Sequence, residues 1–188
     1  MAKQNKKSIA VFIDRDGTII KERNYLKKIK DIELLPGVVE ALKILNDTGY
    51  KTIVVTNQSG IGRGYVTEKK VIEINAYLVK LLKKKGVKID ALYYCPHAPD
   101  AGCSCRKPKL GMIKQAKAKF NIDLKKSYTI GDHTNDFLLG QNMGGTGIFI
   151  LTGHGKEELI KIKNSKGKLK PDAVEQNLLK AVYWLLSR

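Results

Sequence analysis

The sequence predicts an α/β protein with a doubly wound parallel sheet of Rossmann-like plan, and two observations carry this prediction. Short apolar runs recur along the chain, at residues 9–13, 52–56, 128–131 and 147–151, with a further one at 91–94. Runs that are apolar on both faces are typical of strands buried in a parallel sheet. Segments with helical spacing lie between them, and this alternation predicts βαβ units with helices on both faces of the sheet.

Five helices are predicted from apolar spacing and from residues that favour helix ends. They lie at about 36–46, 71–82, 110–120, 136–143 and 178–186. Pro36 suits the first position of its helix, Thr67 suits an N-cap, and Gly86 suits a helix end. The chain shows no internal repeat and no inserted second domain, so residues 1–188 are predicted to form one domain.

The composition suits a globular protein that does not enter a membrane. Hydrophobic residues make up 43% of the chain, but no apolar run approaches the roughly 18 residues of a membrane span. Residues 1–7 are polar and basic, and no apolar core follows them that would make a secretory signal. We therefore expect a basic N-terminal tail at 1–7, no membrane partner and a cytoplasmic location.

The chain is strongly basic, with a net charge of +17. A charge of this sign attracts phosphorylated molecules, including nucleic acid. Only five of the 35 basic residues are Arg, however, and Arg provides bidentate recognition of phosphates and bases. The Lys surplus therefore favours a solvated surface over a nucleic-acid partner. Residues 156–170, with six Lys, are predicted to form a basic loop.

Polar residues directly follow three of the predicted strands. They are Asp14 to Asp16, Thr56 to Ser59, and Asp132. In a parallel sheet ligands bind at the carboxyl ends of the strands, so these groups should converge. Converging carboxylates repel one another unless a cation lies between them, and oxygen ligands with open positions suit Mg²⁺. Asp14 to Gly17 alone would equally suit a turn, but the other two strand ends favour a magnesium site.

Three cysteines and a histidine lie close together in the sequence. Cys95, His97, Cys103 and Cys105 span 11 residues and include every cysteine of the chain. Cys₃His is a common tetrahedral zinc set, although its ligand gaps are usually two to four residues. Free thiols or a Cys103–Cys105 disulfide are the alternatives, and the odd count argues against a disulfide framework. We predict a zinc-bound loop at 95–105 that leads into Arg106 and Lys107.

Four motifs resemble those of the haloacid dehalogenase-like phosphatases, in the same order and spacing over about residues 8–152. They are Asp14-Arg15-Asp16-Gly17-Thr18, Thr56-Asn57, Lys107, and Gly131-Asp132 with Asp136. The resemblance implies a magnesium-dependent phosphatase in which Asp14 forms an aspartyl phosphate and Asp16 acts as general acid and base. Thr56 and Lys107 would stabilise the transferring phosphoryl group. Mg²⁺ would be bound by Asp14, Asp132 and the backbone carbonyl of Asp16.

The cysteine-containing loop narrows the resemblance to a subgroup of this family. Cys-Pro-His followed by Cys-x-Cys-Arg-Lys-Pro resembles the histidinol-phosphate and D-glycero-D-manno-heptose 1,7-bisphosphate phosphatases, which lack a large cap domain. Residues 56–64 resemble the heptose enzymes more closely, which implies a sugar bisphosphate substrate and 7-phosphatase activity. Histidinol-phosphate phosphatase and a nucleic-acid 3′-phosphatase are the alternatives. The intact motif residues argue against a binding module without activity.

The resemblance also implies which residues contact the substrate. These residues are Arg15, Glu22, Arg23, Asn24, Tyr25, Asn57, Gln58, Ser59, Arg106 and His133. Arg106 would bind the second, non-reacting phosphate. His133 stands where the family usually has Lys, so it would either bind phosphate in a pH-dependent way or have no role. The missing cap and the few exposed apolar stripes predict a monomer.

Overall fold

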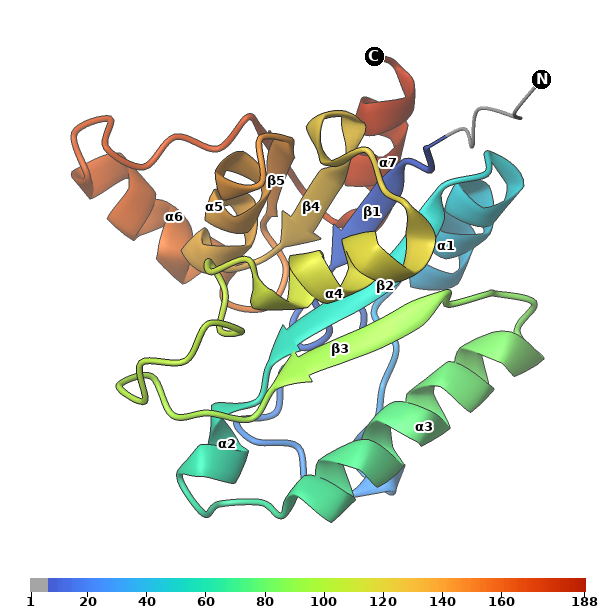
Figure 1. Cartoon of the computed structure of the whole chain (residues 1–188), viewed down its shortest axis with the longest axis vertical. Coiled ribbons are helices and arrows are strands. Elements are labelled where there is room, and N and C mark those ends of the chain that lie inside the picture. Colours follow the sequence, from blue (N-terminus) through green and yellow to red (C-terminus); the bar gives the residue numbers. More distant parts are fainter. Residues whose placement is uncertain (1–6) are drawn as a thin grey trace.

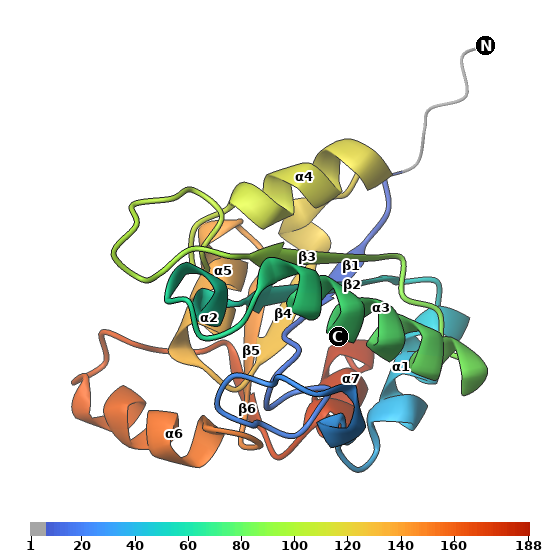
Figure 2. The same cartoon turned by 90° about the horizontal axis from the view of Figure 1, so that it is seen from below.

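A computed structural model describes residues 7–188, so the predicted basic tail lies outside the described residues except for Lys7, which is exposed. Six strands of this part of the chain form one sheet in the order β3-β2-β1-β4-β5-β6. Figure 1 shows the strands β1 to β5 of this sheet, and β6 is labelled in Figure 2. Every neighbouring pair in the sheet is parallel. The predicted fold class is confirmed.

The five longer strands coincide with the predicted apolar runs to within one residue at each end. The strands are β1 (Ala10–Ile13), β2 (Lys51–Asn57), β3 (Ala91–Cys95), β4 (Tyr128–Gly131), β5 (Thr146–Ile150) and β6 (Ala173–Glu175). The edge strand β6 has no predicted counterpart, because it is three residues long and its central Val174 is exposed.

Seven α-helices and two short 3₁₀ turns connect the strands of the described chain. The helices are α1 (Val38–Asp47), α2 (Ser59–Gly62), α3 (Glu68–Lys84), α4 (Gly111–Phe120), α5 (Thr134–Asn142), α6 (Gly155–Asn164) and α7 (Leu178–Leu186), and the turns are Ile29–Asp31 and Leu124–Lys126. Thr67 caps α3 as predicted, since its side chain accepts a hydrogen bond from the backbone of Lys70. Within residues 7–188 no helix is long and apolar enough to cross a bilayer.

The sheet is covered on both faces, which explains why its strands are apolar throughout. Val11 and Ile13 of β1 pack in one core cluster together with residues of α1, α3 and α7. Ala10 and Phe12 belong to a second cluster with residues of α4 and α5. Figure 2 shows α4 on one side of the sheet and α1, α3 and α7 on the other. Alternate residues of a strand point to opposite faces, so both sets must be apolar.

The prediction of a basic loop at 156–170 is wrong for its first half. Residues up to Asn164 belong to α6, whose buried Ile162 packs with Phe149 and Phe137 at the β5 end of the sheet. The acidic residues of α6 lie in its first turn, and two of its three Lys residues, Lys161 and Lys163, lie in its last turn, an order that stabilises a helix through its dipole. The dense Lys content masks the few apolar residues that anchor the helix.

Candidate active site and metal centre

The carboxyl ends of β1, β2 and β4 lie at one edge of the sheet, beside a cavity of about 260 Å³. The four predicted catalytic residues line this cavity, namely Asp14, Asp16, Thr56 and Lys107. Most of the predicted substrate contacts line it as well: Arg15, Glu22, Asn24, Tyr25, Asn57, Gln58, Ser59, Arg106 and His133. The structure thus brings together residues that lie more than a hundred positions apart in the sequence.

Three buried carboxylates form an acidic group beside the cavity. One oxygen each of Asp14, Asp132 and Asp136 lies within 4.8 Å of the others, an arrangement that could hold a metal ion. Burial raises the pKa of Asp14 to about 7, against the lowering effect of Lys107. Burial also raises the pKa of Asp132 well above its ordinary value, and the neighbouring carboxylates add to the effect. A divalent cation fits these residues because it offsets both the desolvation and the mutual repulsion.

The predicted metal ligands lacked one member of this acidic group. Asp136 belongs to the fourth sequence motif, yet only Asp14, Asp16 and Asp132 are in the predicted ligand set. The carboxylate of Asp136 also holds the start of α5, since its Oδ2 accepts a hydrogen bond from the backbone of His133 at 3.0 Å. Its place in the first turn of α5, which follows β4 directly, is the sequence signal that places it here.

Lys107 contacts both the acidic group and the backbone of β2. Its Nζ lies 2.7 Å from Oδ1 of Asp14 and 2.6 Å from Oδ1 of Asp136, and it donates a hydrogen bond to the carbonyl of Val55 at 3.0 Å. Asn57 at the end of β2 accepts from the Lys107 backbone N–H at 3.0 Å and donates to its carbonyl at 3.3 Å. Burial lowers the pKa of Lys107, but Asp136 and Asp14 outweigh it and raise the pKa above its ordinary value. The ammonium is therefore charged at neutral pH.

Asp16 lies apart from the acidic group and has different partners. Its Oδ2 accepts hydrogen bonds from Gln58 Nε2 at 2.8 Å and from Thr56 Oγ1 at 3.4 Å. Arg15 contacts both oxygens of the carboxylate. Because the side chain of Asp16 is partly exposed in the cavity, it can exchange protons with a bound molecule.

Three glycines allow the chain to pass close to the buried carboxylates. A Cβ atom on Gly17 would lie 2.3 Å from Oδ2 of Asp132, and one on Gly153 would lie 2.2 Å from the same oxygen. A Cβ on Gly131 would lie 2.1 Å from Oδ2 of Asp136. Any larger residue at these positions must displace a carboxylate or the backbone.

The substitution Gly153→Ala is expected to weaken divalent-metal affinity by at least about tenfold, because the new methyl group displaces the Asp132 carboxylate. Titration calorimetry with Mg²⁺ measures the change. Gly167→Ala is the matched control, since Gly167 also has a positive φ, of 83°, but nothing lies within 4 Å of the added Cβ. Both variants carry the strain of a left-handed Ala, about 1–2 kcal/mol. Equal metal affinity in the two variants would contradict the expectation.

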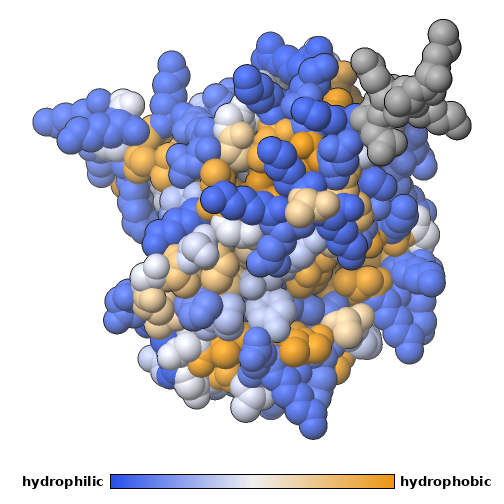
Figure 3. Space-filling view, in the orientation of Figure 1, coloured by the Kyte–Doolittle hydropathy of each residue, from blue (hydrophilic) through white to orange (hydrophobic). Residues whose placement is uncertain are grey.

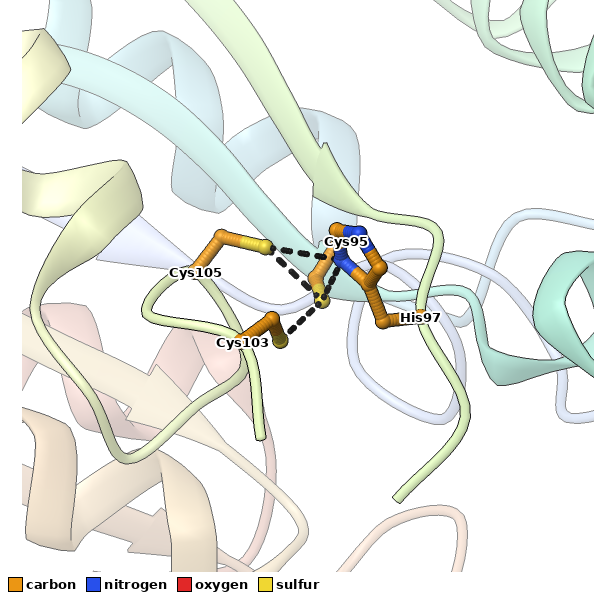
Figure 4. A group of neighbouring side chains, drawn as sticks. All are labelled: Cys95, His97, Cys103 and Cys105. Carbon is orange, nitrogen blue, oxygen red and sulfur yellow. Dashed lines mark hydrogen bonds between the residues drawn. The ribbon is translucent and has the colours of Figure 1, made fainter. Parts of the chain in front are cut away.

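The four predicted zinc ligands point toward one another (Figure 4). Cys95 Sγ lies 3.1 Å from Cys105 Sγ and 3.6 Å from Cys103 Sγ. His97 Nδ1 lies 3.3 Å from Cys105 Sγ and 3.6 Å from Cys95 Sγ. Zn–S bonds of about 2.3 Å in a tetrahedron require ligand atoms about 3.5–3.8 Å apart. A tetrahedral metal ion therefore fits this cluster with only small adjustments.

The thiols of this cluster are free, so the alternative Cys103–Cys105 disulfide is not formed. Burial raises the pKa of Cys95 to about 12. Burial acts to raise the pKa of Cys103, but hydrogen bonds from the backbone of Arg106 and from the neighbouring thiols together outweigh it and lower the pKa to about 7. A bound metal would deprotonate all three thiols, since the thiolate is the ligand form.

The loop that carries the four candidate zinc ligands, residues 95–105, continues directly into the wall of the cavity. Arg106 follows Cys105 and lines the cavity, and its buried Nη1 has no hydrogen-bond partner. On the other side of the loop, the carbonyl of Pro96 accepts a hydrogen bond from Gly62 at the end of α2 at 2.8 Å. The loop thus connects the four-ligand cluster with a guanidinium group that is available to an anion.

Two of the predicted substrate contacts have other surroundings. The guanidinium of Arg15 is buried against Asp16 and Asn75, although the residue borders the cavity. Arg23 is not among the residues lining the cavity, and its side chain pairs with Glu33 at 2.8 Å on the exposed surface. Neither guanidinium is free to meet a molecule in the cavity in this arrangement.

Two histidines, His133 and His154, form part of the cavity wall. The rings of His133 and His154 have centroids 5.0 Å apart, and His133 Nδ1 lies 3.8 Å from Glu158 Oε2. The backbone of His154 donates a hydrogen bond to Asp132 at 2.8 Å. His154 is not among the predicted site residues, although its position just after β5 places it at the same sheet edge. Leu26 and Asn135 are further lining residues without a predicted role.

The chain is similar in sequence to known phosphatases. The family model described as polynucleotide kinase 3 phosphatase matches residues 8–168. The D-glycero-alpha-D-manno-heptose-1,7-bisphosphate 7-phosphatase of Photorhabdus laumondii is 42% identical over 163 residues, which cover 82% of this chain and 89% of that protein. The D-glycero-beta-D-manno-heptose-1,7-bisphosphate 7-phosphatase of Haemophilus ducreyi is 39% identical over 181 residues, covering 92% and 96%.

A solved structure shares the fold over nearly the whole chain. The D,D-heptose 1,7-bisphosphate phosphatase from B. bronchiseptica, complexed with magnesium and phosphate, superposes with a TM-score of 0.84 at 28% identity. The match covers 95% of this chain and 98% of that one. The corresponding enzyme from Burkholderia thailandensis superposes with a TM-score of 0.71, also at 28% identity.

Proposed function

We propose that this chain, which belongs to the polynucleotide kinase 3 phosphatase family of haloacid dehalogenase-like phosphatases, is a magnesium-dependent D-glycero-D-manno-heptose 1,7-bisphosphate 7-phosphatase. The similar heptose bisphosphate phosphatases support this choice of substrate. The observation that supports this most is the buried group of Asp14, Asp132, Asp136 and Lys107 beneath a polar cavity. Relatives are named for the alpha and for the beta anomer, so the proposal does not choose between them.

In the proposed reaction an oxygen of Asp14 attacks the phosphorus of the 7-phosphate. The bond between phosphorus and the sugar oxygen breaks, and Asp16 gives its proton to that oxygen. A water molecule then attacks the phosphorus of the aspartyl phosphate and gives a proton to Asp16. The bond to Asp14 breaks, and inorganic phosphate leaves. Lys107, which is charged at neutral pH, and Thr56 stabilise the phosphoryl oxygens during both steps.

We assign two metals to the two clusters. Asp14, Asp132 and the backbone carbonyl of Asp16 would hold Mg²⁺, with Asp136 completing the acidic group; when bound, the ion neutralises charge on the phosphoryl oxygens. Cys95, His97, Cys103 and Cys105 would hold Zn²⁺ in a closed structural site. The zinc site would act on catalysis only through the placement of Arg106, because Lys107 is also held by Asn57 and by the carbonyl of Val55.

The non-reacting 1-phosphate is proposed to bind Arg106. This guanidinium lines the cavity and has a buried Nη1 without a partner, which is costly unless an anion completes its hydrogen bonding. Planar guanidinium groups bind phosphate with two parallel hydrogen bonds. The sugar would lie along the remaining predicted contacts, which are Glu22, Asn24, Tyr25, Asn57, Gln58, Ser59 and His133.

A substrate panel tests the proposal. With Mg²⁺ present, heptose 1,7-bisphosphate is expected to exceed histidinol phosphate and fructose 1,6-bisphosphate in kcat/KM by about 100-fold, equal to about 2.7 kcal/mol in transition-state binding. Heptose 7-phosphate is the control that lacks the second phosphate. The wild type should hydrolyse it with a lower kcat/KM than the bisphosphate. The variant Arg106→Gln should hydrolyse the two compounds with nearly equal kcat/KM. Phosphate release that is fastest from histidinol phosphate would refute the heptose assignment.

A nucleic-acid 3′-phosphatase is the second candidate, favoured by the name of the family model and by the net charge of +17. A 3′-phosphorylated oligonucleotide therefore belongs in the same panel. Binding through many phosphates falls steeply with salt, so activity on the oligonucleotide should fall sharply between about 50 and 200 mM salt. Hydrolysis of a single sugar bisphosphate should fall much less.

We further propose that the protein acts as a single-domain monomer in the cytoplasm. All six strands of residues 7–188 belong to one sheet. The face in Figure 3 is largely hydrophilic, with apolar residues interrupted by charged ones. The free thiols of the proposed zinc loop suit a reducing compartment. Sedimentation analysis of the purified protein tests the oligomeric state.

A further inference from the structure

Arg15 stands between the proposed nucleophile and the proposed general acid, yet its guanidinium is only 1% exposed. Its Nε and Nη2 donate hydrogen bonds to the two oxygens of Asp16, each at 3.0 Å. Its Nη1 donates to Oδ1 of Asn75 at 2.6 Å. A buried guanidinium is costly unless it is fully paired, and Asn75 supplies the partner on the side away from Asp16.

Asn75 is an unusual residue for its place in the fold. It lies in the middle of α3 and is 6% exposed. Its neighbours on the buried face of this helix, Val71, Ile74 and Leu78, belong to the apolar core. A polar side chain in such a face destabilises the fold unless it is hydrogen-bonded, and Nδ2 of Asn75 has no partner. Packing alone would be served better by an apolar residue.

The two bonds from Arg15 hold Asp16 in one orientation. A planar guanidinium that contacts both oxygens fixes the plane of a carboxylate as well as its position. The other contacts of Asp16, from Gln58 and Thr56, reach only Oδ2. Oδ1 of Asp16 therefore depends on Arg15, and Arg15 depends on Asn75 for its own placement.

We propose that Asn75 is a positioning residue, which through Arg15 orients the Asp16 carboxyl group for proton transfer. The inference rests on the proposed phosphatase reaction, in which the Asp16 proton passes to the leaving sugar oxygen as the phosphorus–oxygen bond breaks. Proton transfer requires the two heavy atoms to come within about 2.6–3.2 Å, so a rotated carboxyl group loses its effect. Arg15 thereby acts through Asp16, and not as the substrate contact that the sequence predicted.

The test compares two leaving groups in a single turnover with Mg²⁺. A sugar alkoxide must be protonated as it leaves, whereas p-nitrophenolate leaves without a proton. Asn75→Ala is expected to slow phosphorus–oxygen cleavage of the best alkyl phosphate of the panel by about 30-fold, with little change in the concentration that gives the half-maximal single-turnover rate. Cleavage of p-nitrophenyl phosphate should slow by less than about threefold. Asn75→Asp keeps the acceptor oxygen and should recover most of the alkyl phosphate rate.

Leu78→Ala is the matched control, since Leu78 is buried on the same face of α3 one turn further along. It should lower the Tm but leave the ratio of the two cleavage rates unchanged. If Asn75→Ala does not fold, Arg15→Lys replaces it, because Lys keeps the charge but cannot contact both oxygens. Equal slowing of both substrates would overturn the positioning role. A wild-type protein that releases phosphate from neither substrate would instead overturn the proposed function.

Discussion

Asp14→Asn is expected to lower turnover by at least about 10⁴-fold, because a carboxamide oxygen does not form the aspartyl phosphate. The fold should be unaffected. Lys107 keeps its contacts with Asp136 and Val55 in the variant, and a carboxamide has nearly the size of a carboxylate. Phosphate release under Mg²⁺ measures the loss, and retained turnover would exclude Asp14 as the nucleophile.

The same variant has a distinct effect on stability in the metal-free protein. Burial raises the pKa of Asp14 from its ordinary value of 3.8 to about 7. The folded protein therefore holds the Asp14 proton more tightly than the unfolded chain does, and this difference stabilises the fold at acidic pH. That contribution is lost as the pH rises from about 4 through 7. The Tm of the wild type should therefore fall over this pH range, and the Tm of Asp14→Asn should fall by less. Asp47→Asn, which changes an exposed carboxylate on α1, is the control and should follow the wild type.

Loss of the zinc cluster is expected to have the second largest effect. Cys105→Ser should abolish stoichiometric zinc and lower kcat/KM for the bisphosphate by about 100-fold, mainly through KM. Arg106 adjoins Cys105 and loses its fixed position. Lys107, in contrast, remains bound to Asn57 by two hydrogen bonds and to Val55 by one. Metal analysis and steady-state kinetics measure the two effects.

Hydrogen exchange locates the change in the protein. Residues 95–106 should exchange faster in Cys105→Ser than in the wild type, while β2 should stay protected. Ser104→Ala is the control, since it alters the same loop without removing a ligand. Protein purified without chelators that contains no zinc would refute the zinc assignment. An unchanged KM in the variant would refute its link to Arg106.

The central part of the site was predictable because it follows from the strands. Each buried strand is an apolar run, and the residue after the run must lie at the sheet edge. Asp14 and Asp132 are therefore placed by β1 and β4, and Thr56 by β2. The cluster of candidate zinc ligands was predictable for a different reason. Its four ligands lie within 11 residues, so a single loop brings them together.

The remaining features of the site and the fold depend on contacts between distant residues, which leave no pattern in the nearby sequence. Asn75 meets Arg15 across 60 residues, and nothing in the helical spacing of α3 indicates which polar residue faces the site. The guanidinium of Arg15 could equally have pointed into the cavity, because its direction depends on that contact. The helix α6 is hidden by its Lys content, and β6 pairs with β5 over only three residues.

The position of β1 in the sheet has a consequence for how the chain folds during synthesis. This strand pairs with β2 on one side and with β4 on the other (Figure 1). At the roughly 5–20 residues per second of synthesis, β4 leaves the ribosome several seconds after β2. Until then β1 presents an unpaired apolar edge, which is a template for aggregation. The nascent chain should therefore bind chaperones most strongly before about residue 131 has emerged.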